Sequence, residues 1–133
     1  MIKLFLSLLL SGALISSSSN LKVTVKDIHT GKGNIVVSVY DSAKNFFKKP
    51  VASQTVKADS TTLNFSFDLP EGIYAVAVYQ DINENNKLDK GWFNIPKEPY
   101  GLSNNFRPKF SAPTFDDCKF KITQQTIITI TLK

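Results

Sequence analysis

The sequence predicts an all-β fold, a seven-stranded β-sandwich of immunoglobulin-like or prealbumin-like type with one long irregular connection. Short segments in which apolar and polar side chains alternate recur along the chain, and turn residues separate them. No stretch of the domain has the apolar period of a long amphipathic helix. Short strands that recur in this way, with such turns between them, are typical of β-sandwiches.

Seven strands are expected, and they differ in how they are buried. In the first, Leu21, Val23 and Val25 alternate with polar residues, which predicts a strand with one buried face. The fifth follows the turn Pro70-Glu71-Gly72, where proline presets φ and glycine permits a left-handed conformation. It is apolar enough to be buried on both faces. The expected strands span residues 21–26, 34–40, 53–57, 61–69, 73–79, 115–122 and 126–132.

A capped turn of helix is expected between the second and third strands. Asp41 or Ser42 would accept hydrogen bonds from amides that have no partner within the helix. Phe46 or Phe47 would then close the edge of the sandwich.

The first 19 residues have the pattern of a secretory signal peptide. A short basic start that contains Lys3 precedes an apolar run, and serines 16–19 supply small residues for cleavage. The run is shorter than the about 20 apolar residues that cross a bilayer, so no transmembrane segment is expected. Residues 20–133 would form one exported domain, located in the periplasm or outside the cell.

Residues 81–113 form an irregular connection that contains four of the six prolines. A connection of this length is unusual within a domain, and such loops are often functional. The alternative is that it covers an open end of the sandwich, and covering loops are also where sites occur.

Several motifs, in order along the chain, resemble the bacterial domain-of-unknown-function family 2141, a set of small exported proteins. The clearest is Ile95-Pro96-Lys97-Glu98-Pro99-Tyr100-Gly101-Leu102-Ser103-Asn104-Asn105; the others are Val39-Tyr40-Asp41, residues 69–76, residues 81–89 and residues 113–117. The resemblance covers residues 21–132. It implies a β-sandwich and export, and it brings no catalytic residue. Asn86 stands where the family commonly has glycine, and Leu102 where it commonly has an aromatic residue.

Side-chain oxygens recur at alternate positions in the loop after the fifth strand. Asp81, Asn83, Asn85 and Asp89 supply them, and Lys87 can offer its carbonyl. Ca²⁺ takes six to eight oxygen ligands, and this spacing lets a tight loop direct them to one point. The sequence therefore predicts a calcium site at these five residues.

The loop departs from an EF-hand at two positions. Asn86 replaces glycine, although asparagine tolerates the left-handed conformation, and Trp92 stands where an EF-hand has its bidentate glutamate. With two aspartates as the only charges, we expect a dissociation constant of about 10⁻⁴ to 10⁻³ M. The alternative is an asparagine-rich turn held by hydrogen bonds from side chains to the backbone.

A second candidate surface is aromatic. The stretch 92–110 interleaves rings with amides, and Trp92, Tyr100, Asn104 and Asn105 are its candidate ligand-binding residues. Sugars bind by ring stacking and amide hydrogen bonds, so a carbohydrate-binding or carbohydrate-processing protein is the alternative function. The other interpretation is that these rings pack against the core.

A zinc site and nucleic-acid binding have little support in the sequence. The only histidine, His29, and the only cysteine, Cys118, cannot build a zinc site from the usual sets of ligands. The formal charge of +5 comes from scattered lysines, which favours solubility or weak attraction to anionic surfaces over nucleic-acid binding. We therefore expect a non-catalytic binding or structural module of the bacterial envelope, with an envelope protein or a glycan as its partner.

Overall fold

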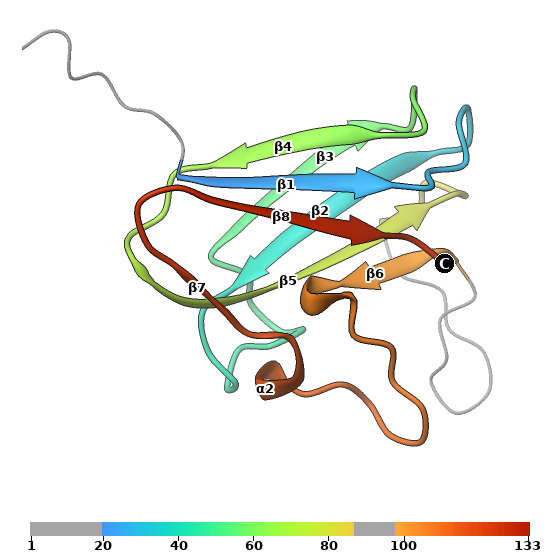
Figure 1. The fold of residues 1–133 in the computed structure, drawn as a ribbon. Coiled ribbons are helices and arrows are strands. Elements are labelled where there is room, and N and C mark those ends of the chain that lie inside the picture. The colour runs from blue at the N-terminus through green and yellow to red at the C-terminus, as the bar shows by residue number, and fades with distance from the viewer. Residues whose placement is uncertain (1–19, 87–97) are drawn as a thin grey trace, which may run out of the picture.

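The computed structural model describes residues 20–86 and 98–133, and this part of the chain is mostly β-sheet (Figure 1). The predicted signal peptide, residues 1–19, lies outside the described residues. The elements are β1 (Leu21–Lys26), β2 (Asn34–Tyr40), β3 (Ala52–Lys57), β4 (Leu63–Phe67), β5 (Gly72–Asp81), β6 (Tyr100–Leu102), the 3₁₀ turn η2 (Ser103–Asn105), α2 (Phe115–Cys118), β7 (Phe120–Ile122) and β8 (Thr126–Thr131). The all-β class is confirmed.

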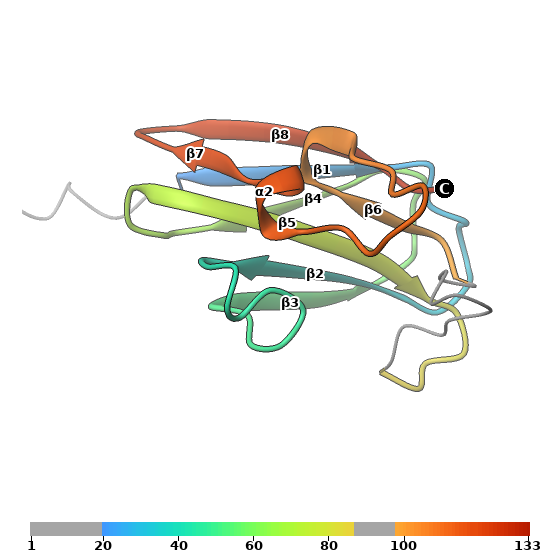
Figure 2. The ribbon, with the colours of Figure 1, turned by 90° about the horizontal axis from the view of Figure 1, so that it is seen from below.

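The strands form two sheets that lie as two layers (Figure 2). The smaller sheet has the order β4-β1-β8, in which β1 is antiparallel to β4 and parallel to β8. The larger sheet has the order β3-β2-β5-β6, and β7 pairs with the first residues of β5. None of the helices in residues 20–86 and 98–133 is long and apolar enough to cross a lipid bilayer.

The main core lies between the two sheets and follows from the alternation seen in the sequence. Leu21, Val23 and Val25 of β1 point inward and are fully buried, while the residues between them are not. They pack in one cluster with Val37 of β2 and Val76 of β5. Each such side chain contributes about 1.5–3 kcal/mol when it is fully buried, so this cluster is the main source of stability.

A second apolar cluster covers the other face of β5. It consists of Tyr40, Phe46, Ala75, Leu102, Phe115 and Cys118. Because Val76 belongs to the first cluster and Ala75 to the second, β5 is buried on both faces, as predicted. Tyr40 of β2, Phe46 of the segment 41–50 and Phe115 of α2 supply the aromatic rings of the second cluster, and Phe46 and Phe115 meet edge to face with ring centroids 6.0 Å apart.

The segment 41–50 has the side-chain cap that the sequence predicts, but residues 43–48 form hydrogen-bonded turns and no helix. Ser42 Oγ accepts a hydrogen bond from the Asn45 amide over 3.3 Å. Of the two phenylalanines proposed to close the edge, Phe46 is buried, whereas Phe47 is 47% exposed and has a φ of 62°.

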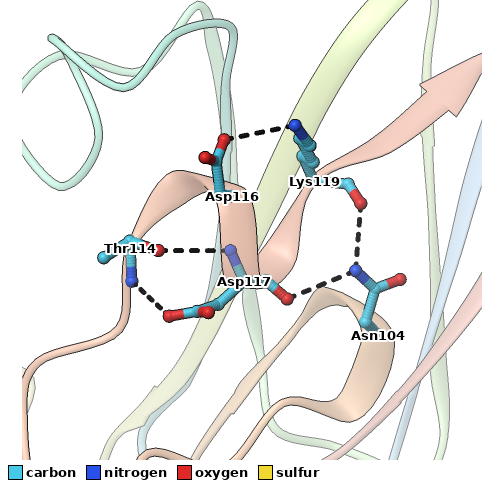
Figure 3. Close-up of polar contacts among 5 residues, drawn as sticks. All are labelled: Asn104, Thr114, Asp116, Asp117 and Lys119. Carbon is cyan, nitrogen blue, oxygen red and sulfur yellow. Dashed lines mark hydrogen bonds and ion pairs between the residues drawn. The ribbon is translucent and has the colours of Figure 1, made fainter.

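Residues 115–122 differ from the prediction of a single strand. Thr114 Oγ1 accepts from the Asp117 amide, and the Asp117 carboxylate accepts from the Thr114 amide, which together form a capping box (Figure 3). This local pairing satisfies two backbone amides at the start of a helix and outweighs the strand-like alternation of the segment. The chain therefore forms α2 first and only then the short strand β7.

The described residues contain eight strands, whereas seven were expected. The additional strand is β6, which lies within the stretch 81–113 that was expected to be irregular. It pairs with β5 through only three residue pairs, from Ala77–Leu102 to Tyr79–Tyr100.

Hydrogen bonds join the two sheets along both sides. Gln54 Nε2 of β3 donates to the Ser66 carbonyl of β4 over 2.7 Å. On the opposite side, Tyr100 and Lys133 exchange two backbone hydrogen bonds of 3.1 Å, so β6 bridges the larger sheet to the end of the chain. Gly101 makes this approach feasible, because a Cβ atom there would lie 2.4 Å from Ile130 Cγ2.

Candidate functional site

The predicted calcium loop begins at Asp81, the last residue of β5, and Asp81 is fully buried. Its backbone is held by its partner strand, since Asp81 pairs with Asn34 of β2. The preceding loop passes so close that a Cβ atom on Gly33 would lie 2.0 Å from the Asp81 carbonyl oxygen. The position of Asp81 is therefore set by the larger sheet and by the loop before β2.

Gln80 also holds the loop before β2 against the end of β5. The Gln80 side chain is fully buried and bonds to the backbone of the loop before β2 at three points. Its Nε2 donates to the carbonyls of His29 and Lys32, each over 2.7 Å, and its Oε1 accepts from the His29 amide over 2.9 Å. The loop is fixed to the end of β5 by an amide whose donors and acceptor are all used.

The Asp81 carboxylate folds the residues that follow into a tight turn, which we term the Asp81 turn (residues 81–86). One carboxylate oxygen accepts from the Asn85 amide over 3.2 Å, and the other accepts from the Asn86 amide over 2.6 Å. Asn83 Oδ1 also accepts from the Asn85 amide, over 3.3 Å. These are the side-chain-to-backbone bonds expected of an asparagine-rich turn.

Asn86 has a φ of 62°, which is the left-handed conformation. Asn86 stands at the position where an EF-hand has glycine, and its backbone has the geometry that a glycine would supply. Asparagine therefore fills that position without distorting the Asp81 turn.

A second carboxylate at this end of β5 was not found by sequence reasoning. Glu98 is only 7% exposed, and one of its oxygens accepts from the Ile82 amide over 2.8 Å. The two residues are 16 positions apart, so no local pattern indicates the contact. A glutamate directly before Pro99 and the strand β6 is the only signal that the sequence offers.

Three residues named in the sequence analysis, Lys87, Asp89 and Trp92, lie outside the described residues. The structure brings Asp81, Asn83 and Asn85 together in one turn. Within residues 20–86 and 98–133, no group of three or more histidine, cysteine, aspartate or glutamate residues is arranged to hold a metal ion. Calcium binding stays a prediction.

The proposed ligand-binding amides, Asn104 and Asn105, are hydrogen-bonded to the protein itself. Asn104 Nδ2 donates to the carbonyls of Lys119 over 3.0 Å and Asp117 over 3.4 Å (Figure 3). It thereby satisfies carbonyls at the end of α2 that have no partner within the helix. Asn104 has a φ of 65°, so a side chain suited to left-handed backbone also supplies this cap.

Asn105 takes the place of a neighbouring strand beside β8. Its Oδ1 accepts from the Thr131 amide over 3.0 Å, and its Nδ2 donates to the Thr129 carbonyl over 3.3 Å. These two backbone groups flank Ile130 and point to the same side of the strand, as they would toward a residue in a parallel partner. The amide therefore occupies part of an edge that would otherwise be open to pairing.

Ser103, which the sequence analysis did not single out as a structural residue, connects three elements. It is fully buried; its Oγ accepts from the Val76 amide over 2.9 Å and donates to the Cys118 carbonyl over 2.6 Å. Together, residues 103–105 bond to β5, α2 and β8. The described end of the segment with the clearest family likeness is thus a junction between the two sheets.

Tyr100 is partly covered. The Arg107 guanidinium carbon lies 4.1 Å from the centre of the Tyr100 ring, and Arg107 Nη1 donates to the Tyr100 carbonyl over 2.9 Å. The role of Tyr100, Asn104 and Asn105 as a ligand surface stays a prediction. The described aromatic residue of the stretch that is most open to solvent is Phe110, which is 100% exposed.

The lone cysteine is positioned to be chemically inert. Cys118 is fully buried in the second cluster, and burial, with a smaller contribution from the charge of Asp117, raises the pKa of its thiol to about 12. At this pKa almost none of the thiolate, which is the reactive form of cysteine, is present at neutral pH.

The fold and these contacts define a two-sheet, all-β protein whose sheets are joined at both sides and whose turn after β5 carries acidic and amide residues. A family model described as "Uncharacterized protein conserved in bacteria (DUF2141)" matches residues 23–129. The chain belongs to this family, as the motifs in its sequence indicated. Comparisons with curated proteins and with solved structures found no match.

Proposed function

We propose that the protein is an exported, non-catalytic binding or structural module of the bacterial envelope that binds Ca²⁺ weakly through residues 81–89. The ligands would be Asp81, Asn83, Asn85 and Asp89, with the carbonyl of Lys87. We further propose that the two sheets form a sandwich of immunoglobulin-like or prealbumin-like type. The strand orders β4-β1-β8 and β3-β2-β5-β6, together with a shared core, support that assignment.

The observation that carries the calcium proposal is the fully buried Asp81 carboxylate at the start of the Asp81 turn. Buried charges in proteins are paired or coordinate metals. Within the described part of the chain, the one ion pair joins Lys119 and Asp116, so no lysine or arginine there neutralises Asp81. Its two amide contacts leave acceptor capacity, because a carboxylate offers about four lone-pair sites.

The turn is already folded around this carboxylate, so the conformational entropy lost when a cation binds is smaller. The charge of the proposed ligand set is small, however, so weak binding is expected, with a dissociation constant of about 10⁻⁴ to 10⁻³ M. Such an affinity suits extracellular surroundings, where calcium is more abundant than in the cytoplasm.

Isothermal titration calorimetry with CaCl₂ tests this proposal. We expect saturable heat at millimolar calcium for the wild type, and none for Asp81→Asn or Asp89→Asn. Asp68→Asn, an exposed aspartate outside the loop, is the matched control and should titrate like the wild type. The absence of heat up to about 10 mM calcium in the wild type would refute the proposal, because that concentration exceeds the expected dissociation constant about tenfold.

A further inference from the structure

Two segments that are far apart in the sequence lie at the same end of the molecule, beside α2. They are the segment between β2 and β3 (residues 41–50) and the segment between η2 and α2 (residues 106–113), and both views show them on either side of α2 (Figures 1 and 2). The edge-to-face contact between Phe46 and Phe115 ties the first segment to α2. Both segments therefore adjoin α2.

Each segment presents an aromatic side chain to solvent. Phe110 is 100% exposed, and Phe47 is 47% exposed. Phe47 has a φ of 62°, a conformation uncommon for a bulky residue, and its ring lies against that of Phe46 with centroids 4.0 Å apart. The outward position of Phe47 is therefore fixed by the backbone and by packing.

The same segments are strongly basic. Residues 41–50 and 106–113 contain five basic residues and one acidic residue. Lys44, Lys48, Lys49 and Lys109 are exposed, and within the described residues none of them takes part in an ion pair. Exposed rings among lysines are the combination that binds the interface of an anionic membrane, where rings enter the headgroup region and lysines attract the lipid charge.

We propose that this surface, the Phe110 face (Phe47, Phe110, Lys44, Lys48, Lys49 and Lys109), docks reversibly on an anionic phospholipid bilayer. A phenylalanine that projects fully from a loop suits a medium that can close around it, whereas a rigid protein partner would need a matching cavity. The four lysines supply charge complementarity to the lipid headgroups. This docking adds to the envelope location proposed above a membrane contact that is independent of calcium.

An environment-sensitive dye at position 111 tests the docking site directly. Ser111→Cys would be labelled with the dye on the chain as recovered from the exporting cell, and buried Cys118, whose thiol is almost wholly protonated, would stay unlabelled. With vesicles of phosphatidylglycerol and phosphatidylethanolamine at low salt, we expect the dye emission to shift to the blue. With phosphatidylcholine vesicles, or with the dye on Thr129→Cys of β8, we expect no shift.

Substitutions then separate the contribution of ring insertion to vesicle binding from that of the lysine charges. In the labelled protein, Phe110→Ser should weaken partitioning into anionic vesicles by about tenfold, because the ring no longer leaves water. Lys48→Gln with Lys49→Gln should weaken it by about tenfold or more at low salt. The matched controls are Ile127→Ser, which is 66% exposed on β8, and Lys22→Gln with Lys26→Gln on β1, and these should change it little.

Three results would overturn the proposal. The first is an unchanged emission at position 111 with anionic vesicles at low salt. The second is an equal loss of partitioning for Ile127→Ser and Phe110→Ser. The third is a response to soluble polygalacturonate as large as that to vesicles, which would assign the surface to an anionic polysaccharide. Vesicle binding is measured without calcium, so its failure is distinguishable from failure of the calcium proposal.

Discussion

Gly33 and Gly31 occupy the same loop before β2, yet the structure makes different demands on them. Both have a positive φ, 68° at Gly33 and 86° at Gly31. A Cβ atom on Gly33 would lie 2.0 Å from the Asp81 carbonyl oxygen, whereas one on Gly31 would meet nothing within 4 Å. Position 33 therefore supports the Asp81 turn directly, and position 31 needs glycine only for its backbone conformation.

This difference predicts unequal effects of the same substitution. Gly31→Ala should lower the free energy of unfolding by about 1–2 kcal/mol, which is the cost of the left-handed conformation alone. Gly33→Ala should lower it further, by about 2–5 kcal/mol in total, because the methyl group also overlaps the backbone at Asp81. Urea denaturation of the two variants measures both values, and equal losses would contradict the close approach of the Asp81 backbone.

At the scale of elements, the short segment 100–105 holds the two sheets together. Tyr100 bonds to Lys133, Ser103 connects β5 to α2, and Asn105 binds the edge of β8. These contacts are each of ordinary strength, and a hydrogen bond contributes about 0.5–1.5 kcal/mol net. Their importance lies in joining elements that are distant in the sequence.

The role of Asn105 predicts the effect of an isosteric change. Asn105→Asp keeps the acceptor for the Thr131 amide but replaces the donor to the Thr129 carbonyl with a negatively charged oxygen. We expect the free energy of unfolding at neutral pH to fall by about 1–2 kcal/mol. Asn64→Asp is the control: Asn64 is exposed and its Oδ1 accepts from Thr24 Oγ1, so the change should stay within about 0.5 kcal/mol. Equal stability of the two variants would show that the Asn105 amide does not protect β8.

The elements also show which parts of the fold can be predicted from the sequence. Strands β1 and β4 were predicted because burial on one face of a pleated sheet leaves a period of two in the sequence, and β5 because burial on both faces leaves a continuous apolar run. Strand β6 is too short to show a period, and it exists because β5 and Lys133 pair with it. At 115–118 the capping box between Thr114 and Asp117 formed a helix despite the alternation.

The candidate site also has some features that local residues predict and others that depend on distant residues. The left-handed conformation of Asn86 and the turn at Asp81 follow from local residues, and local reasoning anticipated both. The contact of Glu98 with Ile82 joins distant positions and leaves no local pattern. Asn104 and Asn105 resemble ligand-binding amides in the sequence because an amide that caps a helix or an edge looks the same there as one that binds a sugar.

At the scale of the whole molecule, two regions of the structure have different chemistry. The Asp81 turn lies at the end of β5, where carboxylates and amides gather, and the Phe110 face carries rings and lysines beside α2. A module with the proposed calcium loop and a basic, aromatic surface fits the envelope role that we propose. The proposed calcium loop can be tested through the thermal stability of the whole protein.

The most direct test is thermal unfolding of the wild type in about 10 mM CaCl₂ and in EDTA. A dissociation constant of about 10⁻³ M predicts about 1.4 kcal/mol of added stability, and hence a rise in Tm of about 4 °C or more. Asp89→Asn should lose this rise, and Asp68→Asn should keep it. An unchanged Tm of the wild type on adding calcium, or an equal rise in Asp89→Asn, would contradict the account.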